Sequence, residues 1–428
     1  MDRRNFVQSA AVASGLLIVK PETAFGYQAN SAVRMGLLGC GNRGTSVATS
    51  FAENTSAQVV ALGDMFADQL AAGKKHFDEV NGKLGKAAID DKMTFRGPHA
   101  YEQLFASKDV DMVQISTPPF FHVHHLEAAV ASGKHVYCEK PVGIDIAQTK
   151  RALEVAKKVK ATQSVDVGFQ CRNAPPIAAI AEKIRGGALG KTALVMGFYN
   201  APASLEKGNA TSMSKDEYRL RNWLWDRALS GDILVEQNIH IIDLCNWILG
   251  SHPLKATATG GRNILTHAGD CWDNYQVDFT YPGDVHLSFA SSQFGAYGVF
   301  QAGLSFFGSE GMATVPYAGP MEIKGDKPWV WQEEGASGSG AGGPVQGKFA
   351  ANGAFEDNLK FADRDKERSF IESITSGKPH NEIASGVETA RSCMLGRMAG
   401  LKKKEVTWDE LLAHGESYEL GMKLEQFV

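Results

Sequence analysis

Three side chains with acid–base character recur at helical spacing near the middle of the sequence. Glu236, His240 and Asp243 lie four and three residues apart, in a mostly apolar stretch that we predict to be one helix from residue 231 to a stop at Gly250. They would share one face, and buried polar groups need partners, water or a ligand. We expect His240 to exchange a proton with a substrate hydroxyl, and Glu236 and Asp243 to orient it or to bind neighbouring hydroxyls.

Lys140 is the second candidate for proton transfer. It is preceded by Glu139 and followed by Pro141, at the end of a predicted strand. A lysine held in this way differs from a freely moving surface lysine, and we expect it to share the proton chemistry with His240. The alternative is a Glu139–Lys140 salt bridge that only shapes the loop.

A glycine-rich turn near the start of the chain predicts a dinucleotide site. The apolar strand 33–38 runs directly into a G-x-G-x-x-G turn, and a helix, a second strand and the acidic residue Asp64 follow. The glycines permit a tight turn, close approach of a pyrophosphate and close helix packing, while the helix N-terminus attracts phosphate. A carboxylate at Asp64 would accept from a ribose hydroxyl and repel a 2′-phosphate, which favours NAD over NADP. The predicted cofactor-binding residues here are Gly39, Gly41, Asn42, Arg43, Gly44 and Asp64.

Strands and helices alternate through the first 165 residues. Strands are predicted at 33–38, 58–62, 110–115 and 135–138, with a helix at 122–132. This alternation is typical of a doubly wound parallel sheet, whose ligands bind beyond the carboxyl ends of the strands. The later part predicts short strands separated by turns, for example at 256–259, 276–281 and 285–291.

One continuous string carries a family resemblance. Thr117-Pro118, His122 and the run Gly133-Lys134-His135-Val136-Tyr137-Cys138-Glu139-Lys140-Pro141 resemble the Gfo/Idh/MocA oxidoreductases. The resemblance implies that Glu139 and Lys140 lie beside the nicotinamide ribose and that Thr117, Pro118 and His122 line the cofactor cleft. It also implies that Gln170 and Arg172 face this cleft. His124 and His125 have no counterpart in the family and are expected on the helix surface.

The resemblance extends, with departures, to the second candidate region. The family pattern G-G-G-x-x-x-D-x-G-x-H-x-x-D matches His240 and Asp243, but Asp232 stands for one of its glycines and Glu236 for the first aspartate. The longer Glu236 side chain would shift its carboxylate relative to substrate hydroxyls, so a copy of inositol dehydrogenase specificity is not expected. The implied fold is α/β: an N-terminal Rossmann doubly wound parallel sheet plus a C-terminal α+β domain with an open, mostly antiparallel sheet that mediates a homodimer or homotetramer.

Composition and the N-terminus limit the classes of function. Residues 1–26, with Arg3-Arg4 before a short apolar run, resemble a twin-arginine export signal, which predicts a periplasmic or otherwise exported protein. We place the NAD(P)-binding Rossmann domain at 32–165 and the substrate and oligomerisation domain at 166–428. The net charge of −4, without a basic run interleaved with aromatics, argues against nucleic acid as a partner. No membrane span is expected after removal of the signal.

The expected function is hydride transfer between nicotinamide and a secondary alcohol of a sugar, glycoside or polyol. NAD is expected to be tightly held, because free cofactor is scarce outside the cytoplasm. One alternative is an NAD-dependent glycosidase that oxidises and re-reduces its substrate with no net oxidation; another is a non-catalytic sugar-binding protein. A metal site at Glu236, His240 and Asp243 would imply hydrolysis or isomerisation, but we expect none because it leaves the dinucleotide motif unexplained.

Overall fold

The structure is a computed structural model that describes residues 32–203, 206–208, 211–266, 269–294, 300–332 and 357–427. The predicted export signal at residues 1–26 lies outside the described residues. In the described part of the chain, none of the helices is both long and apolar enough to cross a bilayer. Two sheets, described next, belong to one compact unit that begins at Val33.

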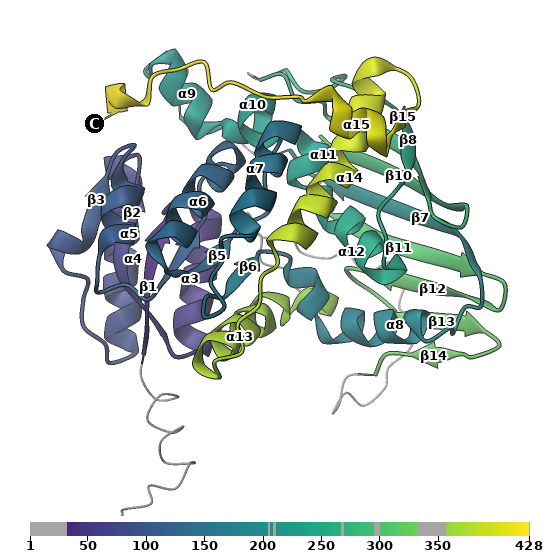
Figure 1. Cartoon of the computed structure of the whole chain (residues 1–428), viewed down its shortest axis with the longest axis horizontal. Coiled ribbons are helices and arrows are strands. Elements are labelled where there is room, and N and C mark those ends of the chain that lie inside the picture. Colours follow the sequence, from purple (N-terminus) through teal and green to yellow (C-terminus); the bar gives the residue numbers. More distant parts are fainter. Residues whose placement is uncertain are drawn as a thin grey trace, which may run out of the picture. The chain divides into compact units, whose positions relative to one another are not determined.

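The first sheet is a six-stranded parallel sheet with the order β3-β2-β1-β4-β5-β6 (Figure 1). Its central strands are almost fully buried, because helices cover both faces and leave little room for polar side chains. This confirms the predicted Rossmann sheet. The strands are β1 Val33–Leu38, β2 Ala57–Asp64, β3 Thr94–Arg96, β4 Met112–Ile115, β5 His135–Cys138 and β6 Val165–Val167.

Helices α3 and α4 pack together beside β2, while α5, α6 and α7 form a second connected group. The helix at 122–132 begins and ends where the sequence predicts it, since Gly133 closes it in the left-handed conformation (φ 84°). The helices of this half are α3 Asn42–Asn54, α4 Ala67–Lys83, α5 Ala100–Ala106, α6 His122–Ser132 and α7 Ile146–Ala156, with short 3₁₀ turns at Asp91–Met93, Pro119–Phe121 and Gln170–Asn173.

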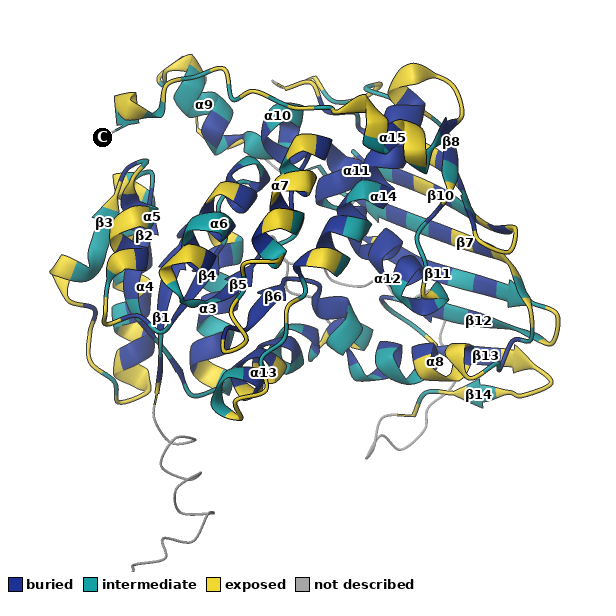
Figure 2. Ribbon diagram, viewed as in Figure 1, coloured by how far each residue is buried: buried dark blue, intermediate teal, exposed yellow. Residues whose placement is uncertain are grey.

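The second sheet has nine strands in the order β14-β13-β12-β11-β7-β10-β9-β8-β15, and every pairing except β7 with β10 is antiparallel. Residues alternate between buried and exposed along β9 and β10, so only one face is covered by helices (Figure 2). The strands are β7 Thr192–Ala201, β8 Lys255–Gly261, β9 Asn274–Tyr281, β10 Val285–Gln293, β11 Gln301–Gly308, β12 Gly311–Pro316, β13 Glu322–Gly325, β14 Trp329–Val330 and β15 Val406–Thr407.

The helices of the later part connect the two sheets. α13 packs against α3, whereas α14 contacts α7 of the first half as well as β8 and β9 of the second sheet, and most of its residues are buried. The helices are α8 Pro175–Arg185, α9 Lys215–Arg221, α10 Arg227–Ser230, α11 Ile233–Glu236, α12 Ile239–Leu249, α13 Ala362–Thr375, α14 Ile383–Lys402 and α15 Trp408–His414, with 3₁₀ turns at Trp223–Trp225, Asp357–Leu359 and Leu424–Phe427.

A buried charge cluster ties α13 to β6 and to the start of α14. Lys366 forms ion pairs with Asp166 and, at 2.6 Å, with Glu382, and His380 Nε2 lies 3.2 Å from Asp166. Burial and the charge of Asp166 raise the pKa of Glu382 to about 7, while the hydrogen bond to Asp166 raises the pKa of His380. Asp166 is shifted the opposite way, to about 2, by Lys366 and its hydrogen-bond partners, which outweigh its burial.

These shifts predict that unfolding becomes easier as the pH rises from about 4.5 to 7. Glu382 and His380 bind protons more tightly in the folded state, so their contribution is complete at low pH and is lost as the pH rises through their folded pKa values. The depressed pKa of Asp166 acts only at more acidic pH. Urea unfolding midpoints at pH 5, 6 and 7 should therefore decline less steeply in Glu382→Gln than in the wild type. Glu372→Gln, an exposed position on α13, is the matched control; an equal slope in Glu382→Gln and wild type would contradict this assignment.

Candidate functional site

The glycine turn between β1 and α3 has the geometry of a phosphate cradle. Gly39 has φ 98°, and a Cβ there would lie 2.5 Å from the carbonyl oxygen of Ser116. A Cβ on Gly44 would lie 2.0 Å from the carbonyl of Gly39, so no larger residue fits. A Cβ on Gly41 would meet nothing within 4 Å, and no side chain caps α3, which begins at Asn42. Free amides therefore face open space, as a pyrophosphate requires.

Asp64 ends β2 next to this turn. Its two carboxylate oxygens accept from the amides of Cys40 at 2.7 Å and Phe66 at 2.9 Å, and burial raises its pKa. A cavity of about 610 Å³ is lined by Asp64, Gly39 and Gly41, and also by Thr117 and Pro118. The structure thus brings together five of the predicted cofactor residues around one cavity large enough for a nucleotide.

The histidines of α6 hold the neighbouring loops. The ring of His122 lies between the carbonyl oxygens of Pro141, at 2.9 Å, and Thr117, at 2.7 Å, so it ties two strand ends together. His125 is buried and contacts the Thr117 hydroxyl at 3.1 Å, and burial lowers its pKa well below the usual value. The expectation that His125 lies on the helix surface is therefore wrong; only His124 is exposed.

Glu139 is held by a charge network that extends far along the sequence. Its carboxylate accepts from Arg43 Nε at 2.9 Å, and the other two nitrogens of that guanidinium bind Asp363 at 2.9 and 2.7 Å. A Cβ at Gly168 would lie 2.6 Å from Glu139, so this glycine leaves room for the carboxylate. Arg43 was predicted as a cofactor residue, but all three nitrogens of its guanidinium form hydrogen bonds with Glu139 and Asp363. Asp363 and Gly168 were not predicted, because nothing in their local sequence marks them.

The predicted single helix from 231 to 250 is wrong: α11 ends at Glu236 and α12 begins at Ile239. In a continuous helix the Glu236 carbonyl would accept from the His240 amide, but that amide instead points to the carbonyl of Gln237 at 3.4 Å. The freed Glu236 carbonyl accepts from Lys140 Nζ, which also pairs with the Glu236 carboxylate at 2.7 Å. Lys140 and Glu236 are 11% and 10% exposed. The break between α11 and α12 thus frees a carbonyl, so that Lys140 is bound by both the carbonyl and the carboxylate of Glu236.

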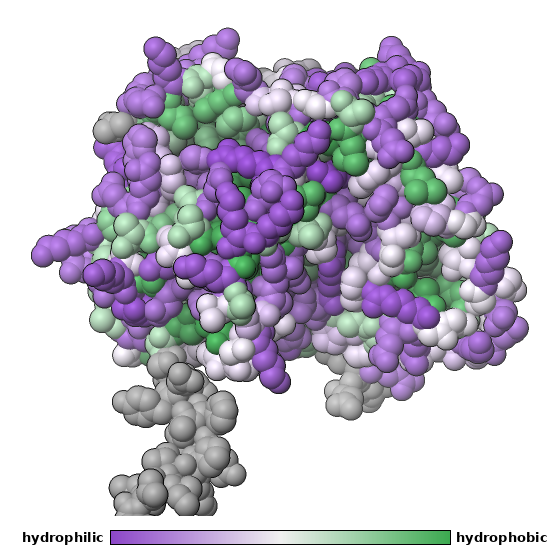
Figure 3. All heavy atoms as spheres, viewed as in Figure 1, coloured by the Kyte–Doolittle hydropathy of each residue, from purple (hydrophilic) through white to green (hydrophobic). Residues whose placement is uncertain are grey.

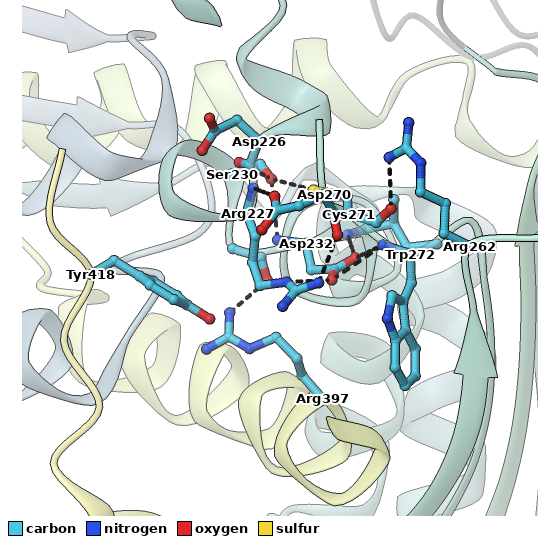
Figure 4. A network of polar contacts seen from close by, with 12 residues as sticks. Asp226, Arg227, Ser230, Asp232, Arg262, Asp270, Cys271, Trp272, Arg397 and Tyr418 are labelled. Atoms are coloured by element: carbon cyan, nitrogen blue, oxygen red, sulfur yellow. Dashed lines mark hydrogen bonds and ion pairs between the residues drawn. The ribbon is translucent and has the colours of Figure 1, made fainter. Parts of the chain in front are cut away.

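Asp232 sets the start of α11 (Figure 4). It has φ 77°, a conformation that normally requires glycine, and its carboxylate caps the amide of Ile233 at 2.8 Å. The same carboxylate accepts from the backbone amide of Trp272 at 3.1 Å and forms an ion pair with Arg227 at 3.1 Å. These partners stabilise a backbone conformation that orients Glu236 one turn later.

His240 lies at the start of α12 and is buried. Its Nδ1 atom is buried and has no hydrogen-bond partner in the protein. Burial, followed by the positive charges of Lys140 and Arg43, lowers its pKa well below 6.5. A neutral imidazole can accept a proton from a bound molecule, and His240 would do so through Nε2, because Nδ1 is closed off from solvent.

Asp243 does not join Lys140 and Glu236. Its carboxylate is bidentate with Arg172, with Nε at 2.8 Å, and accepts from the hydroxyl of Thr389 at 2.9 Å. Arg172 therefore holds Asp243, while the side-chain oxygen of Gln170 is buried without a partner. Asp243 accepts three hydrogen bonds, is 1% exposed and, unlike Asp64, does not line the cavity, so it positions α12 against its neighbours.

The residues of the metal alternative do not converge. In the described ranges, the ligand atoms of Glu236, His240 and Asp243 do not come within reach of one ion, and the grouping that does is Asp166, His380 and Glu382. The ammonium of Lys366 contacts two of these three residues. Glu236, His240 and Asp243, as the structure places them, therefore do not form one set of metal ligands.

A tyrosine from the second sheet was missed by sequence reasoning. Tyr199 on β7 is buried, and its pKa is raised by burial and by the negative charge of Glu236. The negative charge of Glu236 therefore acts on the Tyr199 hydroxyl. No strand was predicted at residues 192–201, and the outward side chains Leu194 and Met196 are apolar as well, so the sequence did not indicate that Tyr199 points inward or what it faces.

Comparisons with known proteins agree with this geometry. The family described as "Oxidoreductase family, NAD-binding Rossmann fold" (GFO_IDH_MocA) matches residues 33–167, and "GFO/IDH/MocA C-terminal domain" matches residues 177–314. Inositol 2-dehydrogenase of Rhizobium meliloti (strain 1021) is 26% identical over 294 residues, which is 68% of this chain and 78% of that protein.

Two further proteins are similar over different extents. A glycosyl hydrolase family 109 protein of Streptomyces niveus is 32% identical over 135 residues, 31% of this chain and 26% of that protein. The structure of a levoglucosan dehydrogenase in complex with NADH and levoglucosan has a TM-score of 0.66 and 17% identity, and covers 88% of this chain and 99% of that one, which shows the shared fold. With both family domains matched in order, the chain belongs to the Gfo/Idh/MocA oxidoreductase family and its first domain is an NAD-binding Rossmann fold.

Proposed function

We propose that this enzyme is an NAD-dependent dehydrogenase that oxidises a secondary alcohol of a sugar, glycoside or cyclic polyol. The observation that carries the proposal is the Lys140–Glu236 pair beside a buried, neutral His240, next to the NAD-binding turn. The relatives named inositol 2-dehydrogenase and levoglucosan dehydrogenase support a polyhydroxylated substrate.

Different side chains of the protein would transfer the proton, stabilise charge and hold the other residues in position. NAD, held by the glycine turn and Asp64, would supply the acceptor for the hydride of the carbinol carbon. His240, neutral at pH 7, takes the proton of the same hydroxyl, and the Lys140 ammonium stabilises the negative charge that develops on that oxygen. Glu236 holds Lys140 in place through its carboxylate and its carbonyl, and Arg43 holds Glu139. Asp243, through Arg172 and Thr389, keeps α12 in position.

NAD is proposed over NADP because of Asp64. The carboxylate lies at the end of β2, on the cavity, where it can accept from a ribose hydroxyl and repel a 2′-phosphate. We further propose export by the twin-arginine route, because of the pattern of residues 1–26, and a tightly held cofactor, because free NAD is scarce outside the cytoplasm. The family resemblance supports a homodimer or homotetramer.

A glycosidase reaction without net oxidation is the second candidate. The two glycosyl hydrolase family 109 proteins are matched over 26% and 25% of their own length, so the similarity does not extend to most of either protein. Both candidates use NAD, and only the dehydrogenase accumulates NADH.

The test uses purified full-length protein. Denaturation and mass spectrometry identify any bound nucleotide; then inositols, aldoses and anhydrosugars are added with NAD or NADP while absorbance of the reduced nicotinamide is followed. We expect reduction of NAD in preference to NADP by at least one of these compounds. Cleavage of a glycoside without lasting NADH would favour the second candidate, and failure to bind either nucleotide would overturn the proposed function.

A further inference from the structure

Four segments that are distant in the sequence form a small hydrophobic cluster beside the cofactor cavity. Two come from the Rossmann half, at residues 66 and 120–121, one from the region of α9, and one from the end of the chain. Figure 3 shows hydrophobic (green) side chains at the surface in the upper left of the view, where Figure 1 has α9 and the end of the chain. We name residues 416–427 the C-terminal strap. The cluster consists of Phe66, Phe120, Phe121, Leu220, Trp223, Leu229, Leu420, Met422, Leu424 and Phe427.

The strap lines the same cavity as the glycine turn and Asp64. Its side chains alternate: Leu420, Met422 and Leu424 are partly buried, whereas the residues between them are exposed. In Figure 1 the strap runs from α15 across to α9. The strap, which ends in the 3₁₀ turn Leu424–Phe427, therefore closes one side of the nucleotide cavity with its apolar side chains.

The root of the strap, residues 416–418, is bound to buried residues of the protein (Figure 4). The fully buried Arg397 of α14 pairs with Glu416 and donates to the carbonyl of Gly231 at 2.6 Å, and its guanidinium lies 5.2 Å from the ring of Tyr418. The amide of Tyr418 donates to Asp145 at 2.8 Å. Because Arg397 also reaches the residue before Asp232, the root is connected to the start of α11.

The tip of the strap, residues 420–427, has contacts that are less buried than those of the root. The carbonyl of Leu420 accepts from Arg219 at 2.7 Å, and the side chain of Gln426 donates to Asp216 at 2.9 Å, so both polar contacts are made with α9. The ring of Phe427 lies 5.8 Å from the ring of Phe66, which belongs to the turn after Asp64. These contacts are partly exposed, and they can break while the root stays in place.

We propose that the C-terminal strap is the outer wall of the adenosine pocket and retains NAD(H) between turnovers. This inference rests on the proposed function. The apolar side chains of the strap fit the face of an adenine ring, whose ribose would lie at Asp64. The dinucleotide leaves only after the tip detaches from α9 and Phe66, so the strap slows dissociation and has little effect on hydride transfer itself.

The test measures release of NADH from the full-length protein by displacement with excess NAD in a stopped-flow fluorimeter. The variants are a chain that ends at Glu419, the double variant Leu424→Ala/Phe427→Ala, and Glu419→Ala as the exposed control in the strap. We expect the dissociation rate to rise about 10–100-fold in the first two variants, since affinity changes appear mostly in the dissociation rate. The control should match wild type, and kcat at saturating NAD should stay within about threefold of wild type, as expected for lost uniform binding.

A thermal melt accompanies each variant. Folded variants that release NADH at the wild-type rate would overturn the inference while leaving the proposed function intact. If the shortened chain does not fold, the double variant decides by the same criterion. An intact protein that binds no NAD would instead overturn the proposed function and the strap's role together.

Discussion

Replacing Lys140 by methionine is expected to lower kcat by about 10²–10⁴-fold while the affinity for NAD changes only a few-fold, because general acid–base and electrostatic contributions have this size. Lys140 Nζ is bound by the carboxylate and the carbonyl of Glu236, whereas the glycine turn and Asp64 form the nucleotide cavity without it. Steady-state kinetics at saturating NAD, together with an NAD titration, separate the two effects.

The variant also leaves the Glu236 carboxylate buried without its cation, which costs about 3–5 kcal/mol of stability in comparable cases. The double variant Lys140→Met/Glu236→Gln removes both charges and so separates lost stability from lost chemistry. Lys157→Ala, whose side chain is 69% exposed, is the matched lysine control. A folded Lys140→Met enzyme with kcat within twofold of wild type would remove Lys140 from the mechanism.

The nucleotide half of the site could be predicted from the sequence because its determinants are local. Gly39 has a positive φ, Gly44 packs on the Gly39 carbonyl five residues earlier, Gly41 leaves the space in front of the turn open, and Asp64 is the last residue of a strand. Parallel strands then bring their carboxyl ends to one edge, which places Thr117 near the same cavity. Local spacing fixes such features before any tertiary contact is known.

The substrate half depends on contacts between distant segments, and there the sequence predicted the residues better than their roles. The apolar pattern of residues 231–250 favours one helix, and no residue type marks the break after Glu236. That break is stabilised by Lys140, 96 residues away. Asp243 has the spacing of a catalytic residue, yet Arg172 and Thr389 occupy its carboxylate. Helical periodicity gives the face of a side chain but not its partner.

Charge pairs between distant segments could not be predicted from the sequence either. Arg43 belongs to the glycine motif, but it is Asp363, 320 residues later, that fixes its guanidinium. The same holds for Arg397 and the strap, since an isolated arginine in a helix gives no indication that it anchors the end of the chain. One-dimensional patterns contain no information on such pairs.

Replacing His240 by asparagine is expected to lower kcat by about 10²–10³-fold, within the range for loss of a general base. The structure also predicts the pH dependence of the wild-type enzyme. Burial, aided by the charges of Lys140 and Arg43, lowers the pKa of His240 well below 6.5, so the base stays unprotonated to a lower pH than an exposed histidine would.

The acid limb of the kcat/KM profile, which reports the free enzyme, should therefore have its midpoint below pH 6.5, and activity should fall only as the pH drops through the depressed pKa of His240. In His240→Asn the residual activity should no longer show this limb. His286→Asn, whose side chain is 53% exposed on β10, should retain the wild-type profile. A wild-type midpoint at or above 6.5, or an unchanged acid limb in His240→Asn, would show that the proton goes to another group. Lys140, which pairs with Glu236, is then the remaining candidate for the proton acceptor. Comparing Lys140→Met with His240→Asn identifies which of the two side chains takes the proton.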